Sequence, residues 1–171
     1  AVDIILEMNI PGFDPARLTS LEMVLSLGAP LHNEHKDRLN RLLPERFYEL
    51  YGLTEGFVTV LDARDAAAHP DSVGVPLPWS GLRIVGPDGT VLPPGEVGEI
   101  VGHGPLLTPG YFGRPDLTAQ AIIDGWLHSG DLGELDAEGF LVYRGRVKEM
   151  IKPGGFNVAT QEIEVFLKSH P

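Results

Sequence analysis

Three short stretches of this sequence carry the side chains that could do chemistry. Residues 51–55 read YGLTE and place an aromatic ring, a hydroxyl and a carboxylate close together. Asp131 ends the stretch WLHSGD, and Arg146 follows it after one predicted strand. Lys152 comes shortly before a pair of glycines. A ring, a hydroxyl, carboxylates and cations are the groups that hold a nucleotide and its metal ion, so nucleotide chemistry is the first hypothesis.

Residues 51–55 suit the base and the phosphates of such a nucleotide. Tyr51 offers a ring face to a flat base, and Gly52 lets the backbone approach closely because it has no side chain. The Thr54 hydroxyl can donate to a phosphate oxygen, and Glu55 is the hard oxygen ligand that magnesium prefers. The alternative is a strand end and a turn with an exposed glutamate, because short motifs recur by chance.

Asp131 and Arg146 suit the sugar. A carboxylate that accepts hydrogen bonds from both ribose hydroxyls is a recurrent way to fix a nucleotide, and Arg146 can converge on the same sugar. The alternative is a surface aspartate in a glycine turn and an unrelated surface arginine. Lys152, with Gly154 and Gly155, would admit a long thin ligand such as a pantetheine arm. Its alternative is a tight turn with a solvated lysine.

Composition narrows the function classes. The chain of 171 residues has 13 basic and 24 acidic residues, a net charge of −11, so it repels a phosphate backbone and nucleic acid is not an expected partner. It has no cysteine, which removes disulfides and thiolate chemistry. The six histidines form no ligand set. No apolar run is long enough to span a bilayer, and the start lacks a basic signal-peptide region, so we expect a cytoplasmic protein.

The first part of the chain has the order of strand, helix and strand that is typical of α/β folds. An apolar run predicts a strand over 21–27, and Pro44 closes a helix predicted over 31–43. The apolar face of that helix is predicted to carry Leu39 and to leave Lys36 elsewhere. A second strand is expected over 46–51. Ligands gather at the carboxyl ends of such parallel strands, where residues 28–30 and 51–55 fall.

After residue 73 the predicted elements are mainly short strands. Short strands are predicted over 82–85, 97–101, 132–135 and 140–143, separated by glycine and proline turns, with one helix over 116–123. A short hairpin is expected around Pro153. A last helix is predicted to begin at Thr160, and a short first helix is predicted over 1–9. We therefore predict α/β plus β: the end of a parallel α/β subdomain (1–72), a small distorted β-barrel (73–145) and the start of an α+β C-terminal lid (146–171).

The motifs, in this order, resemble the adenylate-forming superfamily, which includes acyl-CoA and aryl-CoA synthetases, adenylation domains of peptide synthetases and beetle luciferases. The resemblance covers essentially the whole chain. It rests on the turn Gly28-Ala29-Pro30, the segment Tyr51 to Glu55, the barrel segments around Gly98 and Gly110-Tyr111, the stretch Trp126 to Asp131, the pair Gly145-Arg146, and the segment Lys152 to Phe156.

The resemblance implies roles for individual residues. Catalysis would involve Thr54, Glu55 and Lys152, with Glu55 as the magnesium ligand and Lys148 as the hinge of the lid. The nucleotide and coenzyme A would contact Gly28, Ala29, Pro30, Tyr51, Gly52, Thr54, Asp131, Arg146, Gly154 and Gly155. Glu49 departs from the asparagine that relatives often carry near the adenine.

The resemblance also implies an activity. A fatty or aromatic acid would react with ATP, helped by magnesium, to give an acyl-adenylate, and coenzyme A would then take the acyl group. Alternatives are an adenylation domain that loads a carrier protein, an oxidase of the luciferase type and a non-catalytic nucleotide-binding module. The phosphate loop and the C-terminal lysine of the family are absent, so we expect a fragment of a larger ligase that is inactive alone.

Overall fold

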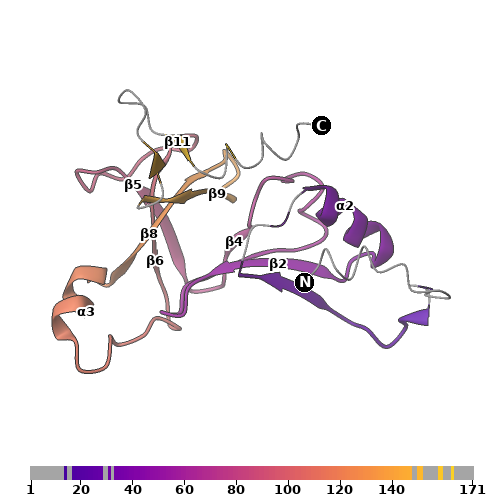
Figure 1. The fold of residues 1–171 in the computed structure, drawn as a ribbon, viewed down its shortest axis with the longest axis horizontal. Coiled ribbons are helices and arrows are strands. Elements are labelled where there is room, and N and C mark those ends of the chain that lie inside the picture. The colour runs from indigo at the N-terminus through magenta and orange to yellow at the C-terminus, as the bar shows by residue number, and fades with distance from the viewer. Residues whose placement is uncertain are drawn as a thin grey trace.

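The computed structural model of the chain describes residues 14, 17–28, 31, 33–147, 150–151, 158–159 and 163. These residues form a small mixed sheet that carries one helix and a larger antiparallel sheet beside it (Figure 1). No helix within the described ranges is long and apolar enough to cross a membrane. The α/β part followed by a β part confirms the predicted fold class.

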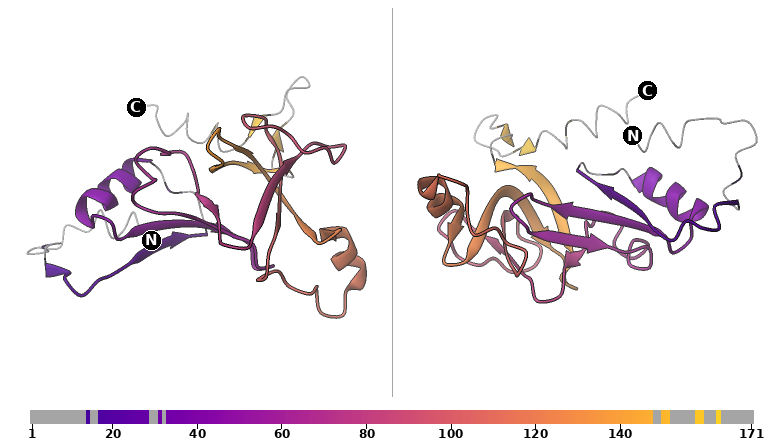
Figure 2. Two further views of the ribbon diagram at one scale, coloured as in Figure 1. Left: turned by 180° about the vertical axis from the view of Figure 1, so that it is seen from behind. Right: turned by 90° about the horizontal axis from the view of Figure 1, so that it is seen from below.

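The first sheet has the strand order β1-β2-β3-β4. Its elements are β1 (Val24–Leu27), α2 (Asn33–Leu42), β2 (Phe47–Gly52), β3 (Val58–Leu61) and β4 (Val75–Pro76). Strands β1 and β2 are parallel and are connected through α2, whereas β3 and β4 add antiparallel partners. The helix lies over one side of this sheet, where Leu39 packs on Phe47 (Figure 2). The carboxyl end of β2 therefore delivers residues 51–55, as the apolar patterning predicts.

The second sheet is antiparallel throughout. It consists of β5 (Gly81–Val85), β6 (Gly98–His103), β7 (Ile122–Ile123), β8 (Trp126–Leu135) and β9 (Leu141–Arg146), with α3 (Pro115–Ala121) between β6 and β7. Gly139, in the turn between β8 and β9, has a φ of 88°, which explains why the turn uses glycine. The predicted helix over 116–123 is wrong at its end, because Ile122 and Ile123 pair with β8 instead.

An apolar cluster joins the two sheets. It contains Phe57, Val73, Ile84, Ile100, Leu127 and Leu141. Phe57 lies so close to β6 that a Cβ at Gly102 would be 2.2 Å from its ring. Backbone hydrogen bonds also connect them, because the Val73 amide donates to the Leu141 carbonyl at 2.8 Å. The end of β2 is therefore held against the second sheet, which brings segments far apart in the sequence together.

The last described strands form the predicted hairpin. Strand β10 (Met150–Ile151) pairs antiparallel with β11 (Val158–Ala159). The helix predicted over 1–9 lies outside the described residues, and of the helix predicted from Thr160 only residue 163 is described, in a helical conformation.

Candidate functional site

Asp131 is the centre of the candidate site. Its side chain is buried in β8, with only 2% of the residue exposed. The Tyr51 hydroxyl donates to Asp131 Oδ2 at 2.8 Å, and Arg146 Nε donates to Asp131 Oδ1 at 2.9 Å. Asp131 and Arg146 are direct partners in the register of β8 and β9. The structure thus brings together three of the residues that the sequence nominates, and Asp131 lies within a strand rather than in a surface turn.

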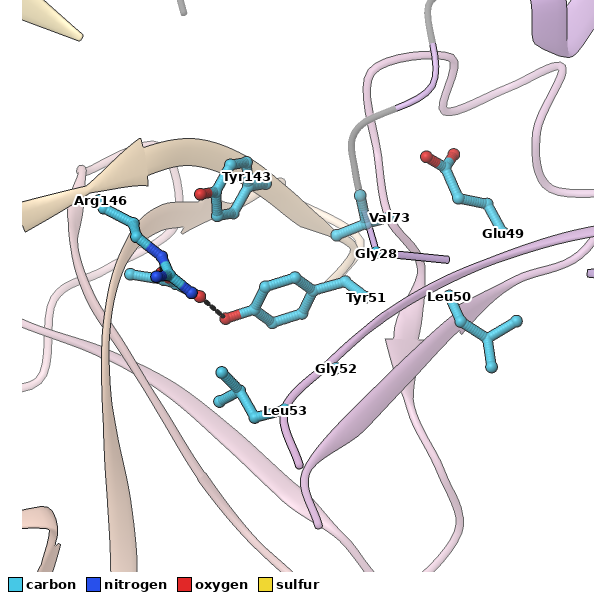
Figure 3. A pocket seen from close by; sticks show the side chains of 10 residues that line it. Gly28, Glu49, Leu50, Tyr51, Gly52, Leu53, Val73, Tyr143 and Arg146 are labelled. Atoms are coloured by element: carbon cyan, nitrogen blue, oxygen red, sulfur yellow. Dashed lines mark hydrogen bonds and ion pairs between the residues drawn. The ribbon is translucent and has the colours of Figure 1, made fainter. Parts of the chain in front are cut away.

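A pocket opens beside this cluster. Its lining includes Gly28, Glu49, Leu50, Tyr51, Gly52, Leu53, Val73, Asp131, Tyr143 and Arg146. Figure 3 shows the Tyr51 ring extending toward Arg146, with Tyr143 above it. The ring is fixed in place, because its centroid lies 5.6 Å from that of Tyr143 and 6.5 Å from that of Phe57. Burial, reinforced by the Asp131 carboxylate, raises the pKa of Tyr51 far above its usual value, so the phenol stays neutral and donates.

Glu49, in the lining of the pocket, belongs to a buried ion pair. Glu49 is 2% exposed and Lys36 is 5% exposed, and the Lys36 ammonium lies 2.6 Å from Glu49 Oε2. The same ammonium donates to the carbonyls of Pro70 and Ser72, each at 3.1 Å. The prediction that Lys36 lies off the buried face of the helix is therefore wrong. A lysine on that face is tolerated because a carboxylate and two carbonyls satisfy its three donors.

Glu49 also connects β2 to a residue that follows β1. The Leu31 amide donates to Glu49 Oε1 at 3.2 Å, and Gly28, directly after β1, lines the pocket. The carboxylate therefore braces the pocket wall in addition to facing it. In the sequence, Glu49 stands out only because it departs from the asparagine that relatives often carry. No spacing pattern pairs it with Lys36.

Thr54 and Glu55 lie just beyond the pocket, immediately after Leu53. Glu55 Oε1 accepts a hydrogen bond from the Tyr111 hydroxyl at 2.7 Å, and Oε2 accepts one from Thr54 Oγ1 at 3.1 Å. The bond from Tyr111 lowers the pKa of Glu55 below its ordinary value, and the charge of Arg146 acts in the same direction. Glu55 is thus an ionised carboxylate whose two oxygens are oriented by neighbouring hydroxyl donors.

This donor set fits magnesium that is bound together with phosphates. Each carboxylate oxygen of Glu55 has a second lone pair beyond the one used by its donor. Magnesium is usually held by one or two carboxylates plus substrate phosphate oxygens and waters, not by an all-protein cage. The described part of the chain contains no cluster of three or more His, Cys, Asp or Glu side chains that could hold a metal ion.

The Glu55 pKa leads to a prediction about pH. A lowered pKa keeps the Glu55 carboxylate charged at every pH above that pKa. The contribution of Glu55 to the binding of ATP with magnesium should therefore be lost only as the pH falls through the lowered pKa. Glu55→Gln in the full-length protein is expected to weaken magnesium-dependent ATP binding by about tenfold or more. The wild-type to variant affinity ratio should stay constant from about pH 8 to about pH 5, because glutamate ordinarily titrates near 4.3. Calorimetric titrations of both proteins across this pH range measure the ratio. Protonation of ATP affects both proteins equally, so it cancels in the ratio. A ratio that collapses near neutral pH would contradict the assignment.

The remaining nominated residues lie outside the described part of the chain. These are Ala29, Pro30, Lys148, Lys152, Gly154 and Gly155. Conversely, the structure adds Lys36, Tyr111 and Tyr143 to the surroundings of the site. Tyr143 could have been found as the aromatic residue three positions before Arg146 on a predicted strand. Tyr111 belongs to the Gly110-Tyr111 segment of the resemblance, but no spacing pattern pairs it with Glu55, which it meets only through the fold.

Comparisons with known proteins extend these observations. The family model described as AMP-binding enzyme matches residues 1–112. A feruloyl-CoA synthase from Amycolatopsis sp is 42% identical over 164 residues, which are 94% of this chain and 33% of that protein. A long-chain-fatty-acid–CoA ligase from Salmonella typhimurium is 37% identical over 164 residues, 95% of this chain and 29% of that protein. The chain therefore spans about a third of the length of these relatives.

The fold matches solved structures equally well. The O-succinylbenzoate coenzyme A synthetase from Bacillus subtilis, solved in complex with ATP and magnesium ion, superposes with a TM-score of 0.82 at 32% identity. The match covers 92% of this chain and 35% of the synthetase.

Proposed function

Because the chain belongs to the family of AMP-binding enzymes, we propose that the protein carrying it is an AMP-forming acid–thiol ligase. A carboxylic acid attacks the α-phosphorus of ATP, which forms an acyl-adenylate and releases pyrophosphate. The coenzyme A thiol then attacks the acyl carbonyl, which forms a thioester and releases AMP. Similarity to a feruloyl-CoA synthase and to a long-chain-fatty-acid–CoA ligase supports an aromatic or fatty acid as the substrate.

The observation that carries this proposal is the buried Asp131 carboxylate held from both sides. Arg146 and Tyr51 each donate to one of its oxygens, at 2.9 and 2.8 Å, which fixes the carboxylate and leaves acceptor capacity on each oxygen. A ribose presents two adjacent hydroxyl donors, which match two carboxylate oxygens. We assign Asp131 and Arg146 to the sugar of the nucleotide and Tyr51 to its base.

Thr54 and Glu55 come directly after Leu53 at the edge of the pocket, where we place the phosphates of the bound nucleotide. The exposed Thr54 hydroxyl has one proton and would turn it from Glu55 to the α-phosphate, where charge develops during the attack of the acid. Glu55 would hold the magnesium ion, whose chemistry is to neutralise the charge of the phosphates and the leaving pyrophosphate. The chain's own contribution is thus to bind and orient the nucleotide and its metal ion.

We assign the second step to the C-terminal segment, with Lys148 as the hinge and residues 152–156 as the path of the thiol. Lys152→Ala in the full-length protein is expected to leave acid-dependent pyrophosphate release unchanged. Thioester formation should slow by on the order of tenfold, the loss of one charge-assisted hydrogen bond. Single-turnover assays of each half-reaction measure the two rates separately. Equal loss in both half-reactions would reject the assignment.

The experiment that tests the function is an assay of the full-length protein for acid-dependent pyrophosphate release from ATP with magnesium. A panel of aliphatic and aromatic acids is used, with and without coenzyme A. Release with some acids, and a thioester only when coenzyme A is present, is the expected result. Adenylate that accumulates without transfer to coenzyme A would favour a carrier protein as acceptor. No release with any acid, despite AMP binding, would favour a nucleotide-binding module without catalysis.

A further inference from the structure

Glu55 is held by a residue from a distant part of the chain. The Tyr111 hydroxyl donates to Glu55 Oε1 at 2.7 Å across 56 positions of sequence. We propose that Tyr111 is a positioning residue that orients the Glu55 carboxylate for the magnesium ion of the bound nucleotide. The inference rests on the proposed function, in which Glu55 is the magnesium ligand. It implies that the loop between β6 and α3, which carries Tyr111, sets the orientation of that carboxylate.

The contact restrains a side chain that would otherwise be mobile. Glu55 is partly exposed, and a free glutamate at the surface samples many rotamers, so that fixing it costs conformational entropy. Tyr111 on one oxygen and Thr54 on the other, at 2.7 and 3.1 Å, remove that freedom before a ligand arrives. A ligand that needs no reordering binds its ion more tightly than a mobile one.

The chemical nature of the donors suits a metal ligand. A phenol and an alcohol both donate while remaining neutral, so the carboxylate keeps its full charge for the cation. A lysine or arginine in the same place would orient the carboxylate equally well but would oppose the metal's charge.

Tyr111 is itself held in place by α3. Its amide donates to Thr118 Oγ1 at 2.9 Å, and Thr118 Oγ1 donates in turn to the Arg114 carbonyl at 3.0 Å. A Cβ at Gly110 would lie 2.7 Å from Thr118, so glycine lets the backbone approach this helix. The phenol is therefore presented from an anchored backbone, although the residue is 38% exposed.

The backbone of the loop also lies against the segment that carries Glu55. The Thr108 amide donates to the Glu55 carbonyl at 2.7 Å. Gly56 has a φ of 105°, and a Cβ there would lie 1.8 Å from the Leu106 carbonyl oxygen. Main chain and side chain thus fix the loop on the same residue, so a displacement of the loop would move the carboxylate.

The test is Tyr111→Phe in the full-length protein, which removes the hydroxyl and keeps the ring. We measure the affinity for ATP with magnesium, for ATP in the presence of a chelator and for AMP, all by calorimetry. ATP with magnesium is expected to bind about three- to tenfold more weakly, and half-saturation by magnesium should rise by a similar factor. Affinities for AMP and for metal-free ATP should not change.

Two controls make the result specific to the hydroxyl. Phe112→Ala alters the neighbouring, fully exposed side chain of the same loop and is expected to change none of these affinities. In a Glu55→Gln background, Tyr111→Phe should add little, because the two residues act as one unit.

Three outcomes would overturn the inference. Unchanged binding of ATP with magnesium in Tyr111→Phe would remove the positioning role and leave the proposed function intact. An equal loss for AMP and for ATP with magnesium would make the loop a general structural support. A wild-type protein that binds ATP no better with magnesium than without it would reject the metal role of Glu55, and with it both proposals.

Discussion

Replacing Lys36 by methionine is expected to lower the free energy of unfolding by about 3–5 kcal/mol, the usual cost of removing one partner of a buried ion pair. The variant leaves Glu49 2% exposed with its lysine partner gone. Methionine fills most of the volume of the lysine chain, so the loss reports the unpaired charge and the two freed carbonyls instead of a cavity. Urea unfolding followed by circular dichroism measures the change.

Two companion variants separate charge from shape. Lys36→Met combined with Glu49→Leu removes both charges and should recover the part of the lost stability that the unpaired charge causes. The Pro70 and Ser72 carbonyls and the Leu31 amide stay without these partners in the double variant. Arg41→Met changes an exposed cation on the same helix and is expected to shift stability by less than about 0.5 kcal/mol. If Lys36→Met unfolds at the same urea concentration as Arg41→Met, the pair does not brace the fold.

The pair also illustrates where sequence reasoning stops. Helical periodicity located α2 well, and proline at residue 44 ended it as predicted. The same periodicity assigned Lys36 to the solvent side because it treats every lysine as exposed. What keeps Lys36 inside is Glu49 on the next strand and two carbonyls after residue 69, and these are contacts of the folded chain. One-dimensional patterns do not contain such partners.

Strand β8 shows a related limit. Only Leu132 to Leu135 were predicted as a strand, whereas β8 begins at Trp126. The residues between, which include glycine, serine and aspartate, have low strand propensity. They are extended because β6 pairs with them on one side and β9 pairs with Asp131 onward on the other. Strands β3 and β4 were not predicted from the sequence.

The candidate site was more readable than its surroundings. The distance from Asp131 to Arg146 in the sequence, with a strand between them, suggested that they converge, and in the structure their side chains lie 2.9 Å apart. Residue type and order were sufficient there because a two-strand turn fixes the pairing. Tyr51 meets Asp131 across 80 positions and between two sheets, so that contact needed the family resemblance or the fold.

Asp131 should have the largest effect on ligand binding. Asp131→Asn in the full-length protein is expected to weaken AMP binding by about 100-fold, the loss of two hydrogen bonds to a charged acceptor. The neutral amide cannot accept from Arg146, Tyr51 and two ribose hydroxyls as a carboxylate does. Calorimetric titration with AMP measures the change. Asp124→Asn is the matched control, because residue 124 is exposed and its φ of 50° suits asparagine.

Deoxy analogues tell whether the loss arises at the sugar. The wild-type protein should bind AMP about tenfold or more tightly than 2′-deoxy-AMP, because one donor to Asp131 is missing in the analogue. Asp131→Asn should bind both nucleotides with nearly equal affinity, since the acceptor that distinguishes them has been weakened. If the variant still discriminates tenfold, the hydroxyl is recognised elsewhere, and Asp131 acts only by holding Arg146 and Tyr51 in place. The carboxylate would then shape the pocket instead of binding the ribose.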